Sequence, residues 1–305
     1  MKKYLITGGA GFIGSHLADK LIKLGYKVVI IDNLSTGKKE NLNLKAEFYQ
    51  ADICDLKKIK SFFKNVDGVF HLAAIPSVPV SVKDPVLTSN VNILGTINVF
   101  KASIENNVKR IVFASSSAIY GNQKKSPLKE NMAPNPLSPY GLQKLVGEQF
   151  AKLFTELYGM PIVCLRYFNV YGPRIDFNSG YSLVLGKFLK LKAEKKPLTI
   201  FGDGEQTRGF CFVEDVVKAN IKAMESKKIK GGEAINIGTK NSYSINYLAK
   251  MISKDVKYLP KREGDPLHTK ADILLAKKLL DWSPKVDFKE GVELTKQWFE
   301  NIKQK

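Results

Sequence analysis

Cysteine and histidine are scarce in this sequence of 305 residues, which has three of each. None of the cysteines belongs to a C-x-x-C motif: Cys54, Cys164 and Cys211. We therefore expect reduced, mostly buried thiols, as in a cytosolic protein, and no disulfide framework. The histidines are too few and too scattered to predict a metal site: His16, His71 and His268.

A long apolar run is also missing. No stretch approaches the roughly 18 consecutive apolar residues that a membrane-spanning helix requires. The start, MKKYLITGG, passes directly into an expected strand and a glycine turn, without the apolar leader and cleavage site of a signal peptide. We expect a soluble cytoplasmic protein with no membrane partner.

Arginine is rare, although the formal net charge is +19: only five of the 48 basic residues are arginines. The lysines are spread along the whole chain, and no segment combines arginine with aromatic residues as a nucleic-acid groove does. We expect no nucleic-acid partner, but a surface that favours anionic substrates. Because lysine is the default cation here, the arginines are candidates for positions that need a planar, bidentate group, except that Arg110, just before an expected strand, could be structural: Arg110, Arg166, Arg174, Arg208 and Arg262.

Apolar segments alternate with amphipathic helical segments through the first half of the chain. Six of them are expected to be strands: 3–9, 27–32, 46–52, 66–74, 110–116 and 161–170. Strands that are apolar throughout and separated by helices predict an α/β fold, a Rossmann-type doubly wound parallel sheet. After about Val170 the segments shorten, which predicts a smaller interleaved C-terminal α/β substrate domain. The expected division is 1–170 and 171–305, with later returns of the chain to the first domain allowed.

The stretch TGGAGFIGSH follows the first expected strand and opens the first expected helix. Its glycines fit both G-x-G-x-x-G and G-x-x-G-x-x-G, which let backbone approach a pyrophosphate at a helix N-terminus: Gly8, Gly9, Gly11 and Gly14. Asp32 ends the second strand, where a carboxylate binds ribose hydroxyls and repels a 2′-phosphate. We therefore predict NAD as the cofactor. Asp52, at the end of the third strand, could contact the adenine or could cap the following helix.

The stretch LSPYGLQK predicts a helix that begins with a reactive pair. Ser138 is expected to be the N-cap and Pro139 the first helical residue. Tyr140 and Lys144 then lie one turn apart on one face. The helix end and the ammonium favour the phenolate, so we expect the tyrosine pKa to fall from about 10 toward neutrality. A serine of the preceding ASSSAIYG segment, at the sheet edge where ligands bind, could share the substrate proton.

A series of motifs then resembles a known family: TGGAGFIGSH, DNLSTG, HLAA, NILGT, SSSAIYG, NPLSPYGLQK, LRYFNVYGPR, FGDGEQTRGF and REGD. In this order, over essentially the whole chain, they are similar to the extended short-chain dehydrogenase/reductase family, specifically the UDP-hexose 4-epimerases. One departure is Gln143, where a serine is common before the lysine. Tyr140 and Lys144 themselves are intact.

The resemblance implies a reaction and three catalytic residues. Tyr140 is implied as the base, Lys144 as the residue that holds the nicotinamide ribose and lowers the tyrosine pKa, and Ser116 as the catalytic serine/threonine. The implied enzyme oxidises the sugar at C4 to a transient 4-keto sugar and returns the hydride to the opposite face. No net redox change results, so NAD is expected to stay bound between turnovers.

The resemblance also implies the binding residues, with no metal among the ligands. NAD contacts are implied for Gly8, Gly11, Phe12, Ile13, Gly14, Asp32, Asn33, Asp52, Ile53, Leu72, Ala73, Ala74, Tyr140 and Lys144. UDP-sugar contacts are implied for Ser77, Ser116, Ser117, Asn169, Phe201, Arg208, Arg262 and Asp265. Asn169 and the two arginines are expected at the diphosphate, which suits bidentate arginine pairing, and Asp265 near the uridine ribose.

Three features bear on which member of the family this is. Related dehydratases and decarboxylases carry an acid after the catalytic serine/threonine, whereas residues 117–119 here are Ser-Ala-Ile. The loop AIPSVPVSVKDP resembles that of epimerases for N-acetylated sugars, with Ser77 and Ser81 near the sugar. Thr269 is small at a position that gates the sugar's 2-substituent. We therefore expect UDP-GlcNAc/UDP-GalNAc as well as UDP-glucose/UDP-galactose to be substrates.

Two alternatives stay open. One is a different sugar-nucleotide enzyme, such as a UDP-glucuronate 4-epimerase, which a carboxylate-binding pocket in the second domain would indicate. The other is a catalytically silent NAD-binding regulatory protein, which the intact Ser116, Tyr140 and Lys144 disfavour. The resemblance further implies a homodimer built on two long helices, near residues 84–107 and 140–158.

Overall fold

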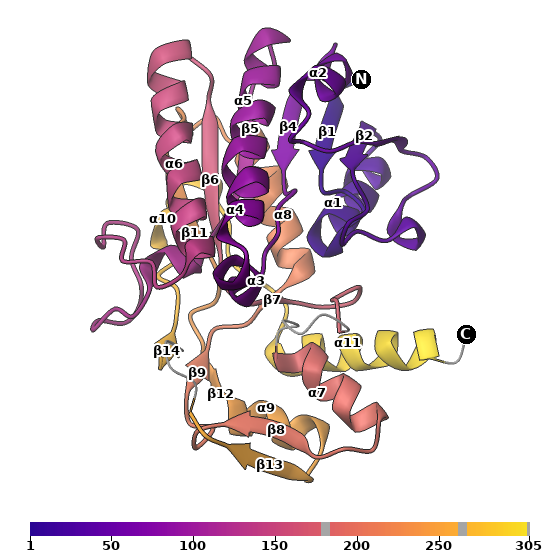
Figure 1. Cartoon of the computed structure of the whole chain (residues 1–305). Helices are drawn as coiled ribbons and strands as arrows, with labels where there is room; N and C mark the ends of the chain where they lie inside the picture. Colours follow the sequence, from indigo (N-terminus) through magenta and orange to yellow (C-terminus); the bar gives the residue numbers. More distant parts are fainter. Residues whose placement is uncertain (178–183, 262–266, 304–305) are drawn as a thin grey trace.

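The computed structural model describes residues 1–177, 184–261 and 267–303 (Figure 1). Seven strands form its central sheet: β1 (Lys3–Thr7), β2 (Lys27–Asp32), β3 (Glu47–Gln50), β4 (Gly68–His71), β5 (Ile111–Ser116), β6 (Ile162–Tyr167) and β11 (Ala234–Ile237). Their order is β11-β6-β5-β4-β1-β2-β3, and every neighbouring pair is parallel. The predicted α/β fold with a doubly wound parallel sheet is confirmed.

Helices cover both faces of this sheet, because successive side chains of a strand point to opposite sides. In β1, Tyr4 and Ile6 pack into one core cluster and Leu5 into the other. The first cluster lies under α1 (Phe12–Lys23), α8 (Val213–Glu225) and α10 (Leu274–Leu280). The second lies under α2 (Leu56–Ile59), α5 (Thr96–Glu105) and α6 (Pro139–Tyr158).

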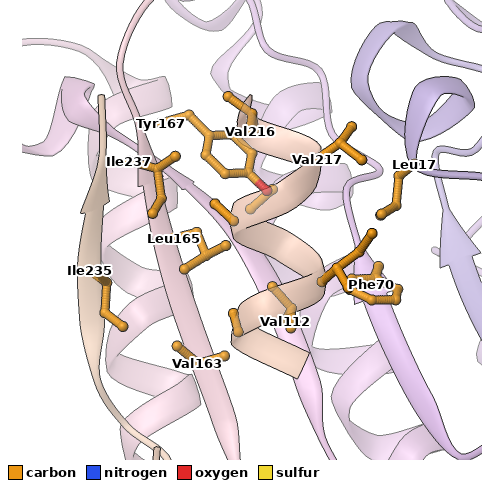
Figure 2. Packing of buried hydrophobic residues seen from close by; sticks show 14 of the residues in the cluster. Leu17, Phe70, Val112, Val163, Leu165, Tyr167, Val216, Val217, Ile235 and Ile237 are labelled. Carbon is orange, nitrogen blue, oxygen red and sulfur yellow. The ribbon is translucent and has the colours of Figure 1, made fainter. Parts of the chain in front are cut away.

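Helix α8 comes from the second half of the chain but packs on the first sheet. Figure 2 shows its Val216 and Val217 facing apolar side chains that include Leu165 of β6 and Phe70 of β4. Arg110, at the start of β5, holds the C-terminal end of this helix. Its guanidinium donates to backbone carbonyls at 2.7–3.2 Å: those of Ala223, Met224, Ser226 and Ile229. Arg110 therefore uses its planar group structurally.

A smaller layer lies beyond the carboxyl edge of the sheet, at the bottom of Figure 1. It contains α7 (Val184–Ala193), β8 (Leu198–Phe201), α9 (Ile245–Ile252), β13 (Val256–Leu259) and α11 (Phe288–Lys303). Short strands connect it to the sheet: β7 (Val170–Tyr171), β9 (Thr207–Arg208), β10 (Cys211–Phe212), β12 (Tyr243–Ser244) and β14 (His268–Thr269). Between these elements the chain goes back to the sheet through α8, β11 and α10. A domain boundary near residue 170 stays a prediction.

The helix expected near residues 84–107 is divided in the structure. It consists of α4 (Pro85–Ser89), a π-helical turn η3 (Asn90–Gly95) and α5. The loop before it contains another helix, α3 (Val78–Lys83). Ser77 caps α3 by accepting from the Val80 amide at 3.2 Å, and Asp84 caps α4 by accepting from the Leu87 amide at 2.9 Å. Each of these helices has a proline in its first turn. A proline is tolerated there because the N–H that it lacks would have no partner within the helix.

Across the three described ranges, no helix combines the length and the apolar character needed to cross a membrane. Within the same ranges, no group of three or more His, Cys, Asp or Glu side chains is arranged to hold a metal ion. All three cysteines are free thiols; Cys164 and Cys211 are buried and Cys54 is partly exposed.

Candidate active site

The glycine turn joins β1 to α1 at the carboxyl edge of the sheet. Gly8 has a φ of +73°, and a Cβ on it would lie 2.7 Å from the Ala73 amide nitrogen. A Cβ on Gly14 would collide with the Gly8 carbonyl oxygen. Gly11 is the N-cap of α1 and supplies no side-chain cap, so the helix presents N–H groups without a competing acceptor. An anionic pyrophosphate suits this end of the helix.

Asp32 stands beside this turn at the end of β2. Its carboxylate accepts from the Ala10 amide at 3.0 Å and from the Leu34 amide at 2.8 Å, which fixes the side chain next to the glycine turn. Its oxygens can accept further hydrogen bonds from a ribose. The structure therefore brings together Asp32 and the glycine turn, as the sequence spacing predicts.

Asp52 and its neighbours lie next to this carboxylate. Asn33 donates to Asp52 at 2.9 Å, and the Cys54 amide donates to Asp52 at 2.8 Å. Burial raises the pKa of Asp52, but these two donors outweigh it and the pKa is lowered overall. The expectation that Asp52 could cap the following helix is wrong: Asp55 caps α2 by accepting from the Lys58 amide at 3.0 Å.

A buried relay of hydrogen bonds runs from Thr7, at the carboxyl end of β1, to the π-turn. Thr96 donates to the Asn92 carbonyl at 2.7 Å, so it must accept from His71 Nε2 at 3.0 Å. His71 Nδ1 then accepts from Thr7 at 2.7 Å, and Thr7 accepts from the Ala73 amide at 3.3 Å. Burial lowers the pKa of His71 to about 3, with the nearby Lys144 charge a smaller contribution, so the ring is neutral with its proton on Nε2.

Tyr140 and Lys144 lie in the first two turns of α6, which starts as predicted. Ser138 is the N-cap and accepts from the Gly141 amide at 3.1 Å, with Pro139 as the first helical residue. Lys144 Nζ donates to the Ala114 carbonyl at 2.7 Å and lies 5.9 Å from the centre of the Tyr140 ring. Ser116, at the end of β5, hydrogen-bonds to the Tyr140 side chain. The structure thus brings together the three residues predicted to be catalytic, which we call the catalytic cluster: Ser116, Tyr140 and Lys144.

The predicted direction of the tyrosine pKa is wrong for the protein alone. Burial raises the pKa of Tyr140 to about 12, and the hydrogen bond from Ser116 only partly offsets this. Burial also lowers the pKa of Lys144 to about 8. Removal from water thus outweighs the helix end and the neighbouring ammonium: Lys144 is buried and Tyr140 is half-buried.

A buried ion pair behind the cluster was not anticipated from the sequence. Glu148 accepts from Ser115 at 2.5 Å and from Arg166 Nη2 at 2.7 Å. Although burial opposes the charge, Glu148 raises the pKa of the Arg166 guanidinium, so the guanidinium stays charged. Tyr140, Lys144 and Glu148 recur every four residues on α6. This four-residue spacing and the rarity of arginine are the two sequence features that indicate such an ion pair.

The expected substrate residues of the second half gather around β9 and β14. Asn169, with a φ of +36°, donates to the Gly209 carbonyl and to Thr269 Oγ1, both at 3.2 Å. Thr269 is paired with Arg208 across the two short strands. Arg208 donates to the Thr207 carbonyl at 3.0 Å. Phe201 ends β8 under the Lys187 ammonium, while Arg262 and Asp265 lie outside the described residues.

The serines of the α3 segment have mainly structural contacts. Ser77 is 9% exposed and caps α3. Ser81 is fully buried, donates to the Val78 carbonyl at 2.6 Å and accepts from the Tyr140 amide at 3.0 Å. Ser81 therefore joins α3 to the start of the catalytic helix, and Ser77 remains the more accessible of the two. Ser117 begins the short helical turn that follows Ser116.

Comparisons with known proteins agree with this geometry. The family profile described as "NAD dependent epimerase/dehydratase family" matches residues 4–238. A putative UDP-glucose 4-epimerase of Methanocaldococcus jannaschii is 45% identical over 97% of this chain and 98% of its own. The crystal structure of a Thermotoga maritima UDP-glucose 4-epimerase with UDP-glucose has a TM-score of 0.94 at 41% identity, covering 98% of this chain and 99% of that one. A UDP-N-acetylglucosamine 4-epimerase of Methanobrevibacter ruminantium, in complex with UDP-N-acetylmuramic acid, has a TM-score of 0.94 at 42% identity and covers 100% and 99%.

Proposed function

The chain belongs to the NAD dependent epimerase/dehydratase family, and from this premise we propose that it interconverts UDP-sugars at C4 through a transient 4-keto sugar. The observation that carries the proposal is the catalytic cluster. Ser116, Tyr140 and Lys144 come from β5 and α6 and converge at the carboxyl edge of the sheet, the edge that also holds the glycine turn. The enzyme is an isomerase that uses NAD.

The residues around the glycine turn fit NAD. The uncapped start of α1 and the glycines at positions 8, 11 and 14 suit a pyrophosphate, and Phe12 and Ile13 lie in the same turn. Asp32 suits the ribose hydroxyls, with Asn33, Asp52 and Ile53 beside it for the adenine end. Leu72, Ala73 and Ala74 follow β4 as the adjoining wall. When bound, NAD accepts the hydride from C4 of the sugar and gives it back.

Residues of the chain accept the proton of the sugar hydroxyl and later return it. Tyr140 takes the proton of the sugar 4-hydroxyl while Ser116 holds the oxygen through its hydroxyl. Since burial raises the tyrosine pKa to about 12, the base form depends on positive charge from Lys144 and from the cofactor ring. Tyr140 returns the proton after the keto sugar has turned within the pocket. Residues 117–119 are Ser-Ala-Ile and contain no acid, which disfavours dehydration and decarboxylation and supports simple epimerisation.

We propose that the diphosphate is held by Asn169, Arg208 and Arg262, with Asp265 near the uridine ribose and Phe201 beside the base. Arginine suits this position because its planar group binds phosphate through two hydrogen bonds. At the sugar end, Ser77 and Ser117 complete the pocket. Thr269 is small and leaves room for an N-acetyl group, so we propose UDP-GlcNAc/UDP-GalNAc as substrates in addition to UDP-glucose/UDP-galactose.

We also propose that the protein is a cytoplasmic homodimer. Helices α4 and α6 expose large apolar side chains: Val86 (79% exposed), Leu142 (52%), Leu153 (44%) and Leu157 (64%). Helix α5, which continues the α4 segment, runs beside α6 in Figure 1. We therefore propose that a second copy of the chain packs against α6 and the α4–α5 segment together. The free thiols fit a reducing compartment.

The experiment that tests the proposed function begins with denaturation of the purified protein and identification of the released dinucleotide. Native protein is then assayed with UDP-galactose, UDP-GalNAc and UDP-glucuronate. We expect NAD and turnover of the first two sugars. Turnover of UDP-glucuronate alone would replace the proposal with the glucuronate epimerase, and bound NAD without any turnover would favour a regulatory protein.

A further inference from the structure

Gln143 is the residue of the catalytic helix that departs from the pattern of its family, and it is buried, with 2% of its surface exposed. It lies between Tyr140 and Lys144 in sequence, and its side-chain amide is bonded to α4 and η3. Its Nε2 donates to Thr88 Oγ1 at 2.9 Å and to Ser89 Oγ at 3.1 Å. A serine at this position is too short to reach the same partners.

The hydrogen-bond network fixes the direction of the Gln143 amide. The Thr88 hydroxyl donates to the Asp84 carbonyl at 3.0 Å, so its oxygen can only accept from Gln143. On the other side, Asn92 Oδ1 accepts from the Ile75 amide at 2.8 Å, which turns Asn92 Nδ2 toward Gln143 Oε1 at 2.8 Å. Every donor of both side-chain amides is used.

These contacts close a ring around the start of α6. Asn92 forms two hydrogen bonds with the backbone of Ile75. Its Oδ1 accepts from the Ile75 amide at 2.8 Å, and its Nδ2 donates to the Ile75 carbonyl at 3.1 Å. Ile75 leads into α3, whose Ser81 accepts from the Tyr140 amide. Gln143, on the same helix, closes the ring through Asn92. The segment that contains Ser77 and Ser81 is therefore held to the catalytic helix at both of its ends.

We propose that Gln143 is a positioning residue that keeps the 75–83 segment closed against the catalytic helix and so retains the oxidised sugar between the two hydride transfers. This inference rests on the proposed function. At that stage the sugar has lost a hydride to NAD and a proton to Tyr140, and is a neutral ketone at C4. If the segment opens, the ketone leaves and the enzyme is left with NADH.

The test compares Gln143→Met with Thr155→Val in holoenzyme turning over UDP-galactose. Methionine has a similar length but makes none of the three hydrogen bonds. Thr155 is a matched control: it lies on α6 far from the cluster, and its hydroxyl contacts the Ala151 and Met160 carbonyls at 2.9 and 2.8 Å and accepts from the Ile162 amide at 3.3 Å, so Thr155→Val also loses three contacts. We expect the absorbance and fluorescence of enzyme-bound NADH to accumulate on the order of tenfold faster per turnover in Gln143→Met. Thr155→Val is expected to behave like wild type.

Hydrogen exchange supplies a readout that does not depend on substrate. The Ile75 amide should exchange faster than in wild type in Gln143→Met, and at the wild-type rate in Thr155→Val. If both variants lose similar stability, yet neither NADH accumulation nor Ile75 exchange separates them, Gln143 is only structural and the inference is overturned. If Gln143→Met does not fold, Thr88→Val removes one acceptor of Gln143 and should show a smaller change of the same kind. If the wild-type protein turns over no UDP-sugar, the proposed function is refuted. The exchange measurement would still show whether Gln143 holds the Ile75 end of the 75–83 segment in place.

Discussion

The proposed cofactor side and the proposed substrate side of the site are built differently. On the cofactor side, at the carboxyl ends of β1, β2 and β4, polar side chains are buried and bonded to one another or to backbone, as in Thr7, Asp32 and His71. On the substrate side, Asn169, Arg208 and Thr269 lie on two-residue strands and the segments between them, and Asn169 has a positive φ. A long parallel sheet holds the residues proposed to bind the cofactor, while short segments hold the residues proposed to bind the diphosphate and, at Thr269, to select the sugar.

The largest expected effect separates chemistry from cofactor binding. Tyr140→Phe keeps the ring but removes the proton acceptor, so we expect epimerisation to fall by about 10²–10⁴-fold. NAD should remain bound, because the glycine turn and Asp32 are unchanged. Steady-state rates and the dinucleotide released on denaturation measure the two effects. Full activity in this variant would refute the proposed role of Tyr140.

The next effect tests the rigidity of the cofactor side. His71→Leu leaves the Thr7 hydroxyl without its acceptor and Thr96 without its donor, so we expect a loss of about 2–4 kcal/mol of unfolding free energy. Urea denaturation measures it. Adding Thr7→Val removes one of the two stranded groups, and the double variant should be less destabilised than the sum of the single variants. Simple additivity would show that the relay is not a coupled unit.

On the substrate side we expect a change of preference without a change of fold. Thr269→Tyr should reduce kcat/KM for UDP-GalNAc relative to UDP-galactose by roughly 10–100-fold, because the larger ring fills the space for the N-acetyl group. Thr269→Ser keeps the hydroxyl that accepts from Asn169 and should leave the ratio unchanged. Equal losses for both sugars in Thr269→Tyr would indicate general damage to the pocket.

The last effect is a pH dependence of stability, and it concerns the buried charge of Lys144. Burial lowers the pKa of Lys144 from 10.5 to about 8, so between these pH values the unfolded chain binds more protons than the folded one. Stability of the cofactor-free protein should therefore rise with pH in this window, by at most ~3 kcal/mol from this group. Lys144→Met should lack that rise. Unfolding free energies of the two proteins at several pH values check it, since other titrating groups cancel in the difference; equal slopes would contradict the shifted pKa.

Local patterns were sufficient for much of the cofactor side. Apolar segments predicted the parallel strands, and the Ser-Pro start predicted where α6 begins, because both depend on neighbouring residues. The sequence did not indicate the π-turn at Asn90–Gly95. It also did not indicate the hydrogen bond between Gln143 and Asn92, because these residues are 51 positions apart in the chain. The sign of the Tyr140 pKa shift was missed for a related reason. Burial is a property of the whole fold, whereas the helix end and Lys144 are visible in the local sequence.

The pairing of β11 with β6 has a consequence for how the protein is made. Strand β6 is fully buried, and its outer neighbour is supplied by residues 234–237, more than 60 positions later. While the ribosome is still adding those residues, β6 is an apolar edge strand, the kind of surface that pairs with other nascent chains. We expect a chain ending near residue 170 to aggregate, and premature termination before β11 to be costlier to the cell than truncation after it.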